Sequence, residues 1–236
     1  MRVALFVSCV NDALYPRTGR AVVRLLERLG HEVVFEPEQT CCGQTHWTTG
    51  YHREAEGLAV RFAELFSRYE TVVTPSASCA ATVRTVHPRL TGGAPPPVHE
   101  LTEFLVDVLG VTDVGACFPH RVAYHPTCHS LRVSRLGDRP LRLLRAVRGL
   151  ELADLPEAEE CCGFGGAFAL KNADTSVAMA ADKVRHVRGT GADVVCAVDD
   201  SCLAHIGGML SRLRSGVRAV HLAQILAATG AEGEER

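Results

Sequence analysis

The sequence contains no long apolar run and no surplus of charge of either sign. Its 25 lysines and arginines are nearly balanced by 27 aspartates and glutamates, giving a formal net charge of −2 and a pI near 6.6. Nucleic-acid-binding proteins usually carry a strong basic surplus, so we expect no nucleic-acid partner. Every apolar stretch is shorter than the roughly 20 residues that cross a bilayer as a helix, so we also expect no transmembrane segment.

The amino-terminal stretch, residues 1–9, is apolar but too short to contain the apolar region and cleavage site of a secretory signal peptide. We therefore expect a cytoplasmic protein, whose thiols stay reduced. In that compartment ten cysteines favour metal binding or redox chemistry over disulfides. Disulfides are also not needed to compensate for a small core, because 47% of the residues are hydrophobic.

Two common binding motifs are also missing. No two cysteines have the CxxC spacing that is typical of four-cysteine zinc sites, so zinc is the less favoured metal, although it stays an alternative. The glycine-rich stretch 163–166 is too short to be a dinucleotide fingerprint, which requires GxGxxG directly after a strand. We therefore expect no nucleotide or flavin site.

The cysteines that are present form a pattern that occurs twice. Cys-Cys-Gly at 41–43 returns as Cys-Cys-Gly at 161–163, and each copy has one further cysteine upstream and one downstream. Because corresponding positions lie about 120 residues apart, one half of the chain repeats the other, and we predict two similar lobes, 1–115 and 116–236. The repeated cysteines are Cys9, Cys41, Cys42 and Cys79 in the first lobe, and Cys128, Cys161, Cys162 and Cys202 in the second.

Strand-like and helix-like segments alternate within each half. The predicted strands are 2–8, 32–36, 71–74, 122–125, 193–198 and 218–221, and the main predicted helices are 18–30, 51–69, 101–109, 141–147, 173–188 and 222–228. This alternation predicts an α/β fold: two Rossmann-like lobes, each with a parallel sheet, related by an internal pseudo-twofold repeat. Cys9, Cys79 and Cys202 each follow a predicted strand, and strand carboxyl ends are where such sheets carry their chemistry.

Four thiolates per lobe are enough to hold a four-iron cluster. The adjacent cysteines cannot easily bond to each other without a strained ring, whereas both can bind one multi-iron cluster. A glycine after the pair allows backbone N–H groups to approach sulfur closely. In 161–166 three glycines precede a predicted helix, whose amino terminus would stabilise an anionic cluster and whose donors would raise its reduction potential.

These motifs resemble a known family. Two copies of C…CCG…C, together with Val-Ser-Cys at 7–9, Pro-Ser-Ala-Ser-Cys at 75–79 and Ser-Cys-Leu-Ala-His-Ile at 201–206, are similar to the CCG cysteine-rich iron–sulfur proteins, and among them to the small proteins of L-lactate utilization. The chain more distantly resembles the cysteine-rich subunit of heterodisulfide reductase and the iron–sulfur subunit of glycolate oxidase. The resemblance covers essentially the whole chain.

The resemblance implies that all eight repeated cysteines are cluster ligands, with one iron–sulfur cluster of the [4Fe–4S] type per lobe. It implies an electron-transfer subunit of an L-lactate oxidation complex. The implied partners are two other lactate utilization subunits, a ferredoxin-like iron–sulfur protein and a third small subunit. The alternatives are a thiol–disulfide redox subunit similar to heterodisulfide reductase and a zinc-binding scaffold module.

The reductase motif ends in CxxC, and this chain departs from it in both lobes. The first of those two positions is Ser76 in one lobe and Asp199 in the other. With one thiolate fewer per lobe, disulfide-cleaving chemistry is the less favoured alternative. Asp199 could supply an oxygen ligand in place of the missing thiolate, and Ser76 could do so less readily.

Other cysteines and histidines near the motifs are less favoured as ligands. Cys117 and Cys196 lie outside the repeat, and we expect them to pack in the protein, because free cysteine is often buried. His125 and His129 flank Cys128 and could tune its cluster through hydrogen bonds, but the first lobe has an apolar residue near each equivalent place. We predict a supporting role for both histidines.

Overall fold

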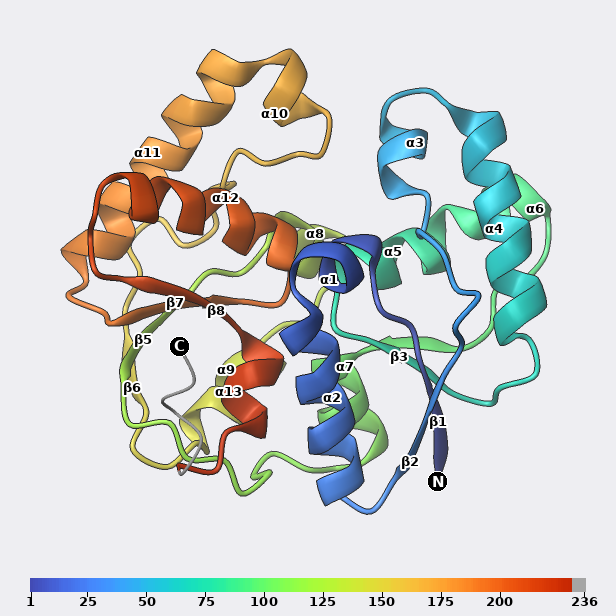
Figure 1. Cartoon of the computed structure of the whole chain (residues 1–236), viewed down its shortest axis with the longest axis horizontal. Coiled ribbons are helices and arrows are strands. Elements are labelled where there is room, and N and C mark those ends of the chain that lie inside the picture. Colours follow the sequence, from blue (N-terminus) through green and yellow to red (C-terminus); the bar gives the residue numbers. More distant parts are fainter. Residues whose placement is uncertain (231–236) are drawn as a thin grey trace. The chain divides into compact units, whose positions relative to one another are not determined.

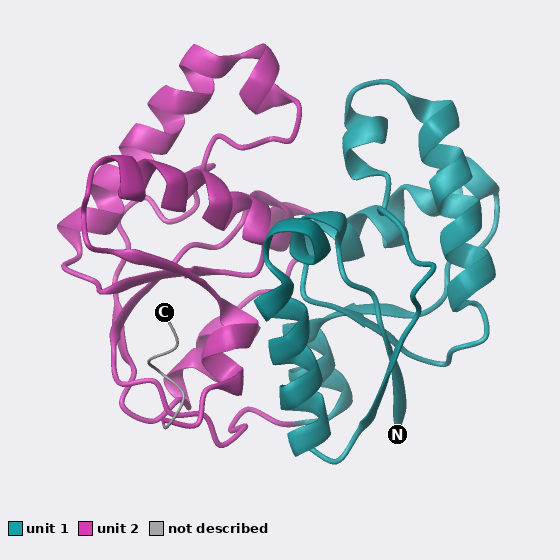
Figure 2. Cartoon of the chain, in the orientation of Figure 1, with its two compact units in different colours: residues 1–110 teal, residues 111–236 magenta. Residues whose placement is uncertain are grey.

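Two four-stranded parallel sheets organise the chain in the computed structural model, which describes residues 1–230 (Figure 1). Each sheet belongs to a separate compact unit, Met1–Gly110 or the unit that begins at Val111 (Figure 2). We call these units the first and the second lobe. The predicted boundary, between residues 115 and 116, lies five positions after the observed one. The α/β architecture with two similar lobes is confirmed.

The first lobe alternates strands and helices throughout. Its strands are β1 (Arg2–Leu5), β2 (Glu32–Phe35), β3 (Val72–Thr74) and β4 (Val98–Glu100). Its helices are α1 (Cys9–Leu14), α2 (Pro16–Arg28), α3 (Gln44–Thr48), α4 (His52–Phe66), α5 (Ala77–Thr85), α6 (His87–Thr91) and α7 (Leu101–Glu103), the last continuing into a π-helical turn, η1 (Phe104–Val108).

The second lobe repeats this plan. Its strands are β5 (Arg121–Tyr124), β6 (Glu151–Ala153), β7 (Val194–Ala197) and β8 (Arg218–His221). Its helices are α8 (Cys128–Arg132), α9 (Arg139–Arg145), α10 (Phe168–Lys171), α11 (Ala173–Gly189), α12 (Asp200–Arg212) and α13 (Leu222–Ala227).

The order of the strands shows where each sheet offers a crevice for a ligand. The orders are β2-β1-β3-β4 and β6-β5-β7-β8, with every pair parallel. The chain therefore reverses its direction of winding between β1 and β3, and again between β5 and β7. In open parallel sheets the crevice at this switch point, outside the carboxyl ends of the strands, is the usual ligand site.

The core of each lobe follows from the apolar periodicity of its helices. In α2, Leu25 and Leu26 are fully buried, and the helix begins at Pro16, which can occupy a first turn because its missing N–H would have no intrahelical partner there. In α4, Phe62 and Phe66 stack on each other with ring centroids 4.6 Å apart. Burying each such side chain contributes about 1.5–3 kcal/mol, so these helices are held mainly by their packing.

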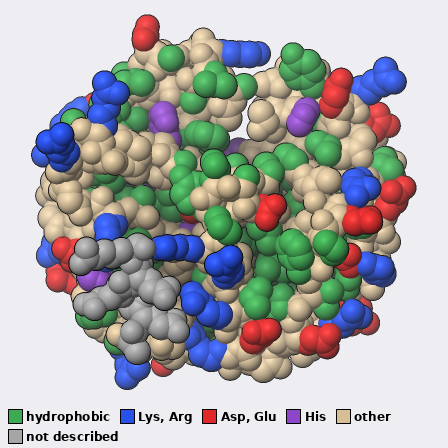
Figure 3. Space-filling view, in the orientation of Figure 1, with side chains coloured by type: hydrophobic (Ala, Val, Ile, Leu, Met, Phe, Trp, Pro, Cys, Tyr) green, Lys and Arg blue, Asp and Glu red, His purple; other side chains and the backbone are tan. Residues whose placement is uncertain are grey.

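No helix within residues 1–230 combines the length and the apolar character that crossing a membrane requires. Acidic and basic side chains both occur over the face shown in Figure 3.

A buried carboxylate after β2 gives the first lobe a pH-dependent contribution to stability. Glu36 accepts hydrogen bonds from the Tyr69 hydroxyl and from the Arg68 guanidinium, and these bonds lower the pKa of Glu36. A lowered folded-state pKa adds stability that is present above the unfolded-state value, near 4.3, and is lost as pH falls below it.

We expect Tyr69→Phe to reduce the free energy of unfolding by about 1 kcal/mol at pH 7, the usual contribution of such a hydrogen bond. The difference between wild type and variant should shrink as pH falls from about 5 toward 3, because the carboxyl then becomes protonated in both. Urea unfolding at a series of pH values measures this difference. A difference that stays constant across the series would contradict the assignment to Glu36.

Candidate metal centres

The four predicted cysteines of the first lobe lie together at the switch point of its sheet. Cys9 is the first residue of α1, directly after β1, and Cys79 lies in the first turn of α5, after β3. The loop after β2 brings the adjacent pair, so that the Sγ atoms of Cys9 and Cys41 lie 3.5 Å apart. Cys42 is hydrogen-bonded to both Cys41 and Cys79. The four thiols therefore form one continuous group.

The second lobe brings its four predicted cysteines together in the same order. Cys128 begins α8 after β5, and Cys202 lies in the first turn of α12 after β7. The thiol of Cys161 is hydrogen-bonded to those of Cys128 and Cys162, and Cys162 is hydrogen-bonded to Cys202. All eight thiols are free, so no disulfide competes with ligand binding.

Helix amino termini support both groups. The helix predicted after the glycines, 173–188, is α11, and the four-residue helix α10 comes between it and the glycines. The helices whose first turns carry cysteines are instead α1, α5, α8 and α12, which follow the central strands. The partial positive charge of a helix amino terminus favours a thiolate over a thiol there.

The glycine after each cysteine pair places a backbone N–H group against a cysteine sulfur. Gly43 and Gly163 adopt φ angles of 82° and 89°, in the left-handed region that glycine accepts most readily. In this conformation the backbone N–H of Gly43 donates to Cys41 Sγ at 3.3 Å, and that of Gly163 donates to Cys161 Sγ at 3.4 Å. The close approach of N–H groups to sulfur that the sequence predicts is present in both lobes.

One cysteine in each lobe is held as a thiolate. Hydrogen bonds from neighbouring thiols, together with the glycine N–H, lower the pKa of Cys41 to about 2 and that of Cys161 to about 2. The thiols that donate these bonds, Cys9 and Cys42 in the first lobe, have raised pKa values for the same reason. Since thiolates are the metal-binding form of cysteine, each group already contains one such ligand within a network of thiols.

Residues from distant parts of the first lobe fix its cysteine loop. Gln39 accepts a hydrogen bond from the Val7 backbone at 2.7 Å and donates to the Leu5 carbonyl at 3.3 Å, which ties the loop to the end of β1. The buried His87 donates from Nε2 to the Cys42 carbonyl at 3.0 Å. Sequence reasoning missed both residues, because the partners of Gln39 lie at the end of β1, more than 30 residues earlier, and His87 lies 45 residues after Cys42.

Different residues fix the loop of the second lobe. Ser176 donates its hydroxyl to the Gly163 carbonyl at 2.8 Å and lies 3.1 Å from Nε2 of His205. Lys183, whose side chain is fully buried, donates to the backbone carbonyls of Glu157 and Ala158, just before the cysteine pair. Burial lowers the pKa of the Lys183 ammonium group. No motif in the sequence pointed to these residues.

The two departures from the CxxC motif are helix N-caps. Ser76 accepts a hydrogen bond from the Cys79 backbone N–H at 3.2 Å, which satisfies the first turn of α5. Asp199 is the N-cap residue of α12 and accepts from the Thr127 hydroxyl at 2.7 Å. The Ser76 side chain thus caps the helix that carries Cys79, and the Asp199 side chain links the start of α12 to Thr127, the N-cap residue of α8. The possibility that either supplies an oxygen ligand stays a prediction.

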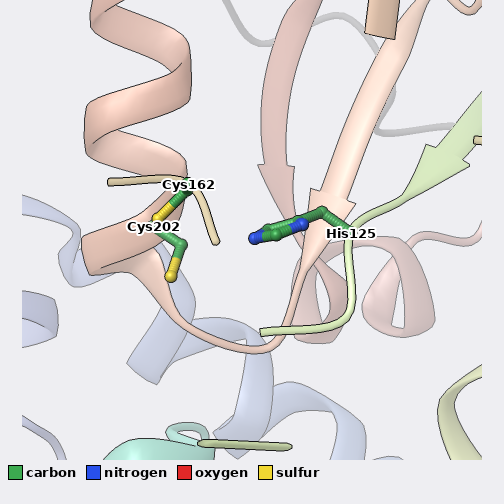
Figure 4. A group of neighbouring side chains, drawn as sticks. All are labelled: His125, Cys162 and Cys202. Carbon is green, nitrogen blue, oxygen red and sulfur yellow. The ribbon is translucent and has the colours of Figure 1, made fainter. Parts of the chain in front are cut away.

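Both histidines that the sequence predicts to support the second group lie beside its cysteines. His125 directly follows β5, is 1% exposed, and has its donor atoms within 4.8 Å of the Sγ atoms of Cys162 and Cys202. Figure 4 shows its imidazole pointing from the end of the strand toward these two cysteines. Burial lowers the pKa of His125 to about 4, with the Lys183 charge acting in the same direction. Nδ1 of His129 lies 3.7 Å from Cys128 Sγ, within hydrogen-bonding distance for sulfur.

The remaining two cysteines, Cys117 and Cys196, do not belong to either group and take part in strand pairing. Cys196 is fully buried within β7, where it pairs in register with Tyr124 and Val220. Burial raises the pKa of its thiol, which opposes the thiolate form. Cys117 forms isolated β-bridges with Arg148 and Thr229. Both positions agree with the packing role that the sequence predicts.

The donor sets fit a thiophilic metal centre. Each lobe offers four sulfur atoms in one group, with backbone N–H groups directed at sulfur and helix amino termini beside it. Soft thiolate ligands select iron–sulfur clusters, zinc and copper(I) rather than magnesium or calcium. The side chains Cys9, Cys41, Cys42 and Cys79 would hold a centre in the first lobe, and Cys128, Cys161, Cys162 and Cys202 in the second.

Comparison with known proteins agrees with this architecture. The family profile described as a cysteine-rich domain, CCG, matches twice, at residues 3–84 and 122–207. The chain belongs to the CCG cysteine-rich family. The two matched segments of this CCG protein contain all eight predicted ligands, four in each. The family resemblance inferred from the motifs is thereby confirmed.

Several curated relatives of this CCG protein share its full length. Lactate utilization protein A from Geobacillus kaustophilus is 43% identical, covering 96% of this chain and 98% of its own. Proteins of the same name from Oceanobacillus iheyensis and Bacillus pumilus are 42% and 41% identical, again over 96% of this chain. Among solved structures, an aspartate racemase homologue from Pyrococcus horikoshii OT3 has a TM-score of 0.36 at 11% identity over 96% of this chain and 95% of its own, too weak a likeness to bear on function.

Proposed function

We propose that this protein is the electron-transfer subunit of an L-lactate oxidation system, with one [4Fe–4S] cluster in each lobe. The observation that carries the proposal is the occurrence of two matching four-thiol groups in a chain that is 43% identical, over nearly its whole length, to lactate utilization protein A. The proposed partners are two other lactate utilization subunits, a ferredoxin-like iron–sulfur protein and a third small subunit.

Two cysteine groups per chain agree with the number of electrons that lactate oxidation releases. Oxidation of a 2-hydroxy acid to a 2-oxo acid releases two electrons and two protons, and a [4Fe–4S] cluster, when bound, takes up one electron. Two groups in one chain therefore match the electron pair. Two features of the chain stabilise the thiolate form of the cysteines. The backbone N–H groups of Gly43 and Gly163 donate hydrogen bonds to Cys41 and Cys161. The first turns of the helices that carry cysteines favour negative charge.

A zinc scaffold is the second candidate, because one sulfur–sulfur separation favours it. Tetrahedral zinc with Zn–S bonds of about 2.3 Å separates its sulfur ligands by roughly 3.8 Å. The Cys9 and Cys41 Sγ atoms are 3.5 Å apart. The missing CxxC spacing counts against zinc, as it does in the sequence.

Metal analysis of anaerobically purified protein distinguishes these candidates. We expect about eight irons and a matching amount of acid-labile sulfide per chain, since two four-iron clusters require them, and an electron paramagnetic resonance signal after reduction. Zinc without sulfide would overturn the redox proposal and leave the scaffold.

Removing one buried ligand from each group tests whether the centres serve lactate oxidation. We expect the Cys42→Ala, Cys162→Ala double variant to lose most of its iron and to abolish lactate oxidation by the reconstituted complex. The matched control removes two thiols outside the groups, Cys117→Ala with Cys196→Ala, and should retain iron and activity. A normal rate of lactate oxidation with the Cys42→Ala, Cys162→Ala variant would contradict the proposal.

A further inference from the structure

The two lobes differ at two buried positions beside their cysteines. The backbone N–H of Phe6 donates to the carbonyl of the strand paired with β1, and the backbone N–H of His125 does the same beside β5, so these residues are equivalent. The buried positions of α4 and α11 also correspond at a constant offset of 121 residues. The corresponding pairs are Ala55 and Ser176, Ala59 and Ala180, Phe62 and Lys183, and Phe66 and Val187.

In the first lobe these positions are purely apolar. Phe6 is fully buried and packs edge-on against Phe62 and Phe66, with ring centroids 4.9 Å and 5.7 Å apart. This arrangement shows that the fold can fill the positions equivalent to His125 and Lys183 with aromatic rings. Nothing about the sheet or the helix therefore demands a histidine at the equivalent place in the second lobe.

In the second lobe the equivalent ring is a buried imidazole without a hydrogen-bond partner. Neither Nδ1 nor Nε2 of His125 is hydrogen-bonded to any described residue, although the residue is only 1% exposed. The Ala158 backbone lies close enough to the ring to oppose the lowering of its pKa by burial, but the contact does not have the geometry of a hydrogen bond. Leaving a buried polar group unsatisfied costs about 1–3 kcal/mol, so a role that uses a ring nitrogen is needed to account for it.

The sulfur atoms of Cys162 and Cys202 lie close to the His125 ring and suggest that a ring nitrogen binds metal. Their Sγ atoms and the donor nitrogen of His125 all lie within 4.8 Å of one another (Figure 4). No hydrogen bond joins the imidazole to either sulfur, and donor atoms this close together suit a shared metal centre. Imidazole nitrogen and thiolate sulfur are ligands for the same metals, iron and zinc included.

We propose that a ring nitrogen of His125 is a fifth donor to the centre held by the second-lobe cysteines, so that this lobe binds its centre through nitrogen and sulfur and the first lobe through sulfur alone. The inference rests on the proposed function, since it concerns the iron centre of the second lobe. It makes the two centres chemically different within one chain. A neutral imidazole added to one set of thiolates gives the two centres different donor sets, so we expect their reduction potentials to differ.

Pulsed electron paramagnetic resonance on the full chain tests this directly. The parent protein carries Cys42→Ala, so that only the second-lobe centre is present, and is prepared with ordinary or ¹⁵N-labelled histidine. We expect nitrogen modulation that changes with the label. It should disappear in His125→Phe, which restores the first-lobe residue, and in the smaller polar change His125→Gln. His129→Gln is the control and should keep the modulation.

The outcomes separate the two proposals. Modulation that survives both His125 substitutions at unchanged iron content would overturn the inference. Absence of label-dependent modulation in a parent that holds about four irons with sulfide, as one four-iron cluster requires, would also overturn it and leave the proposed function intact. A parent without iron and sulfide would overturn both.

Discussion

Replacing Gly163 by alanine is expected to destabilise the second lobe by about 3 kcal/mol or more and to prevent that lobe from holding its centre. A non-glycine residue in the left-handed region costs about 1–2 kcal/mol. The added Cβ would also lie only 2.6 Å from the Ser176 carbonyl oxygen and 3.0 Å from Met179 Cβ. Because the first of these atoms belongs to the backbone of α11, the loop must move, and the N–H bond to Cys161 moves with it.

The equivalent change in the first lobe is the matched control. Gly43 has nearly the same φ angle, but its added Cβ would meet nothing closer than the Ala55 backbone at 3.5 Å, an ordinary contact. Gly43→Ala should therefore cost only the backbone strain, about 1–2 kcal/mol, and should leave its centre in place. Iron content and chemical unfolding of the two variants measure the difference. Equal losses in both lobes would show that φ alone, and not the contact with α11, decides the effect.

The sequence predicted the fold where periodicity was strong. The helix over 173–188 matches α11 to within a residue, because a long amphipathic segment is decided locally, and the strand over 218–221 matches β8. The short helices α1 and α8 were not predicted. Each is only a turn or two long and depends on an N-cap, Ser8 or Thr127, together with the end of a central strand.

The eight cysteines of the candidate centres could be predicted from the internal repeat, since two copies of one pattern mark the same positions twice. Their surroundings could not. Gln39 bonds to Val7, 32 residues away in sequence, and His87 bonds to Cys42, 45 residues away, and only the folded chain brings these pairs together. The repeat also gave no guide to His125, because the equivalent residue of the first lobe is Phe6, and only the structure shows the imidazole close to Cys162 and Cys202.

Replacing Lys183 by methionine is expected to lower the reduction potential of the second-lobe centre. The ammonium group is buried beside the cysteine pair, where a positive charge stabilises the reduced, more negative state of a centre. The expected shift is on the order of 100 mV, because a unit charge held a few ångströms away at an effective dielectric constant near 20 contributes on the order of 2 kcal/mol. Potentiometric titration followed by electron paramagnetic resonance measures it.

The first lobe again provides the control, because Phe62 is the equivalent residue and carries no charge. Phe62→Met should leave the potential of the first-lobe centre almost unchanged, although it removes the edge-on contact with Phe6. Lys183→Arg should restore most of the wild-type potential if charge is the cause, even though the larger side chain must repack. Equal potentials in wild type and Lys183→Met would mean that the ammonium group only supports the carbonyls of Glu157 and Ala158. The difference between the two centres would then have to come from their ligands.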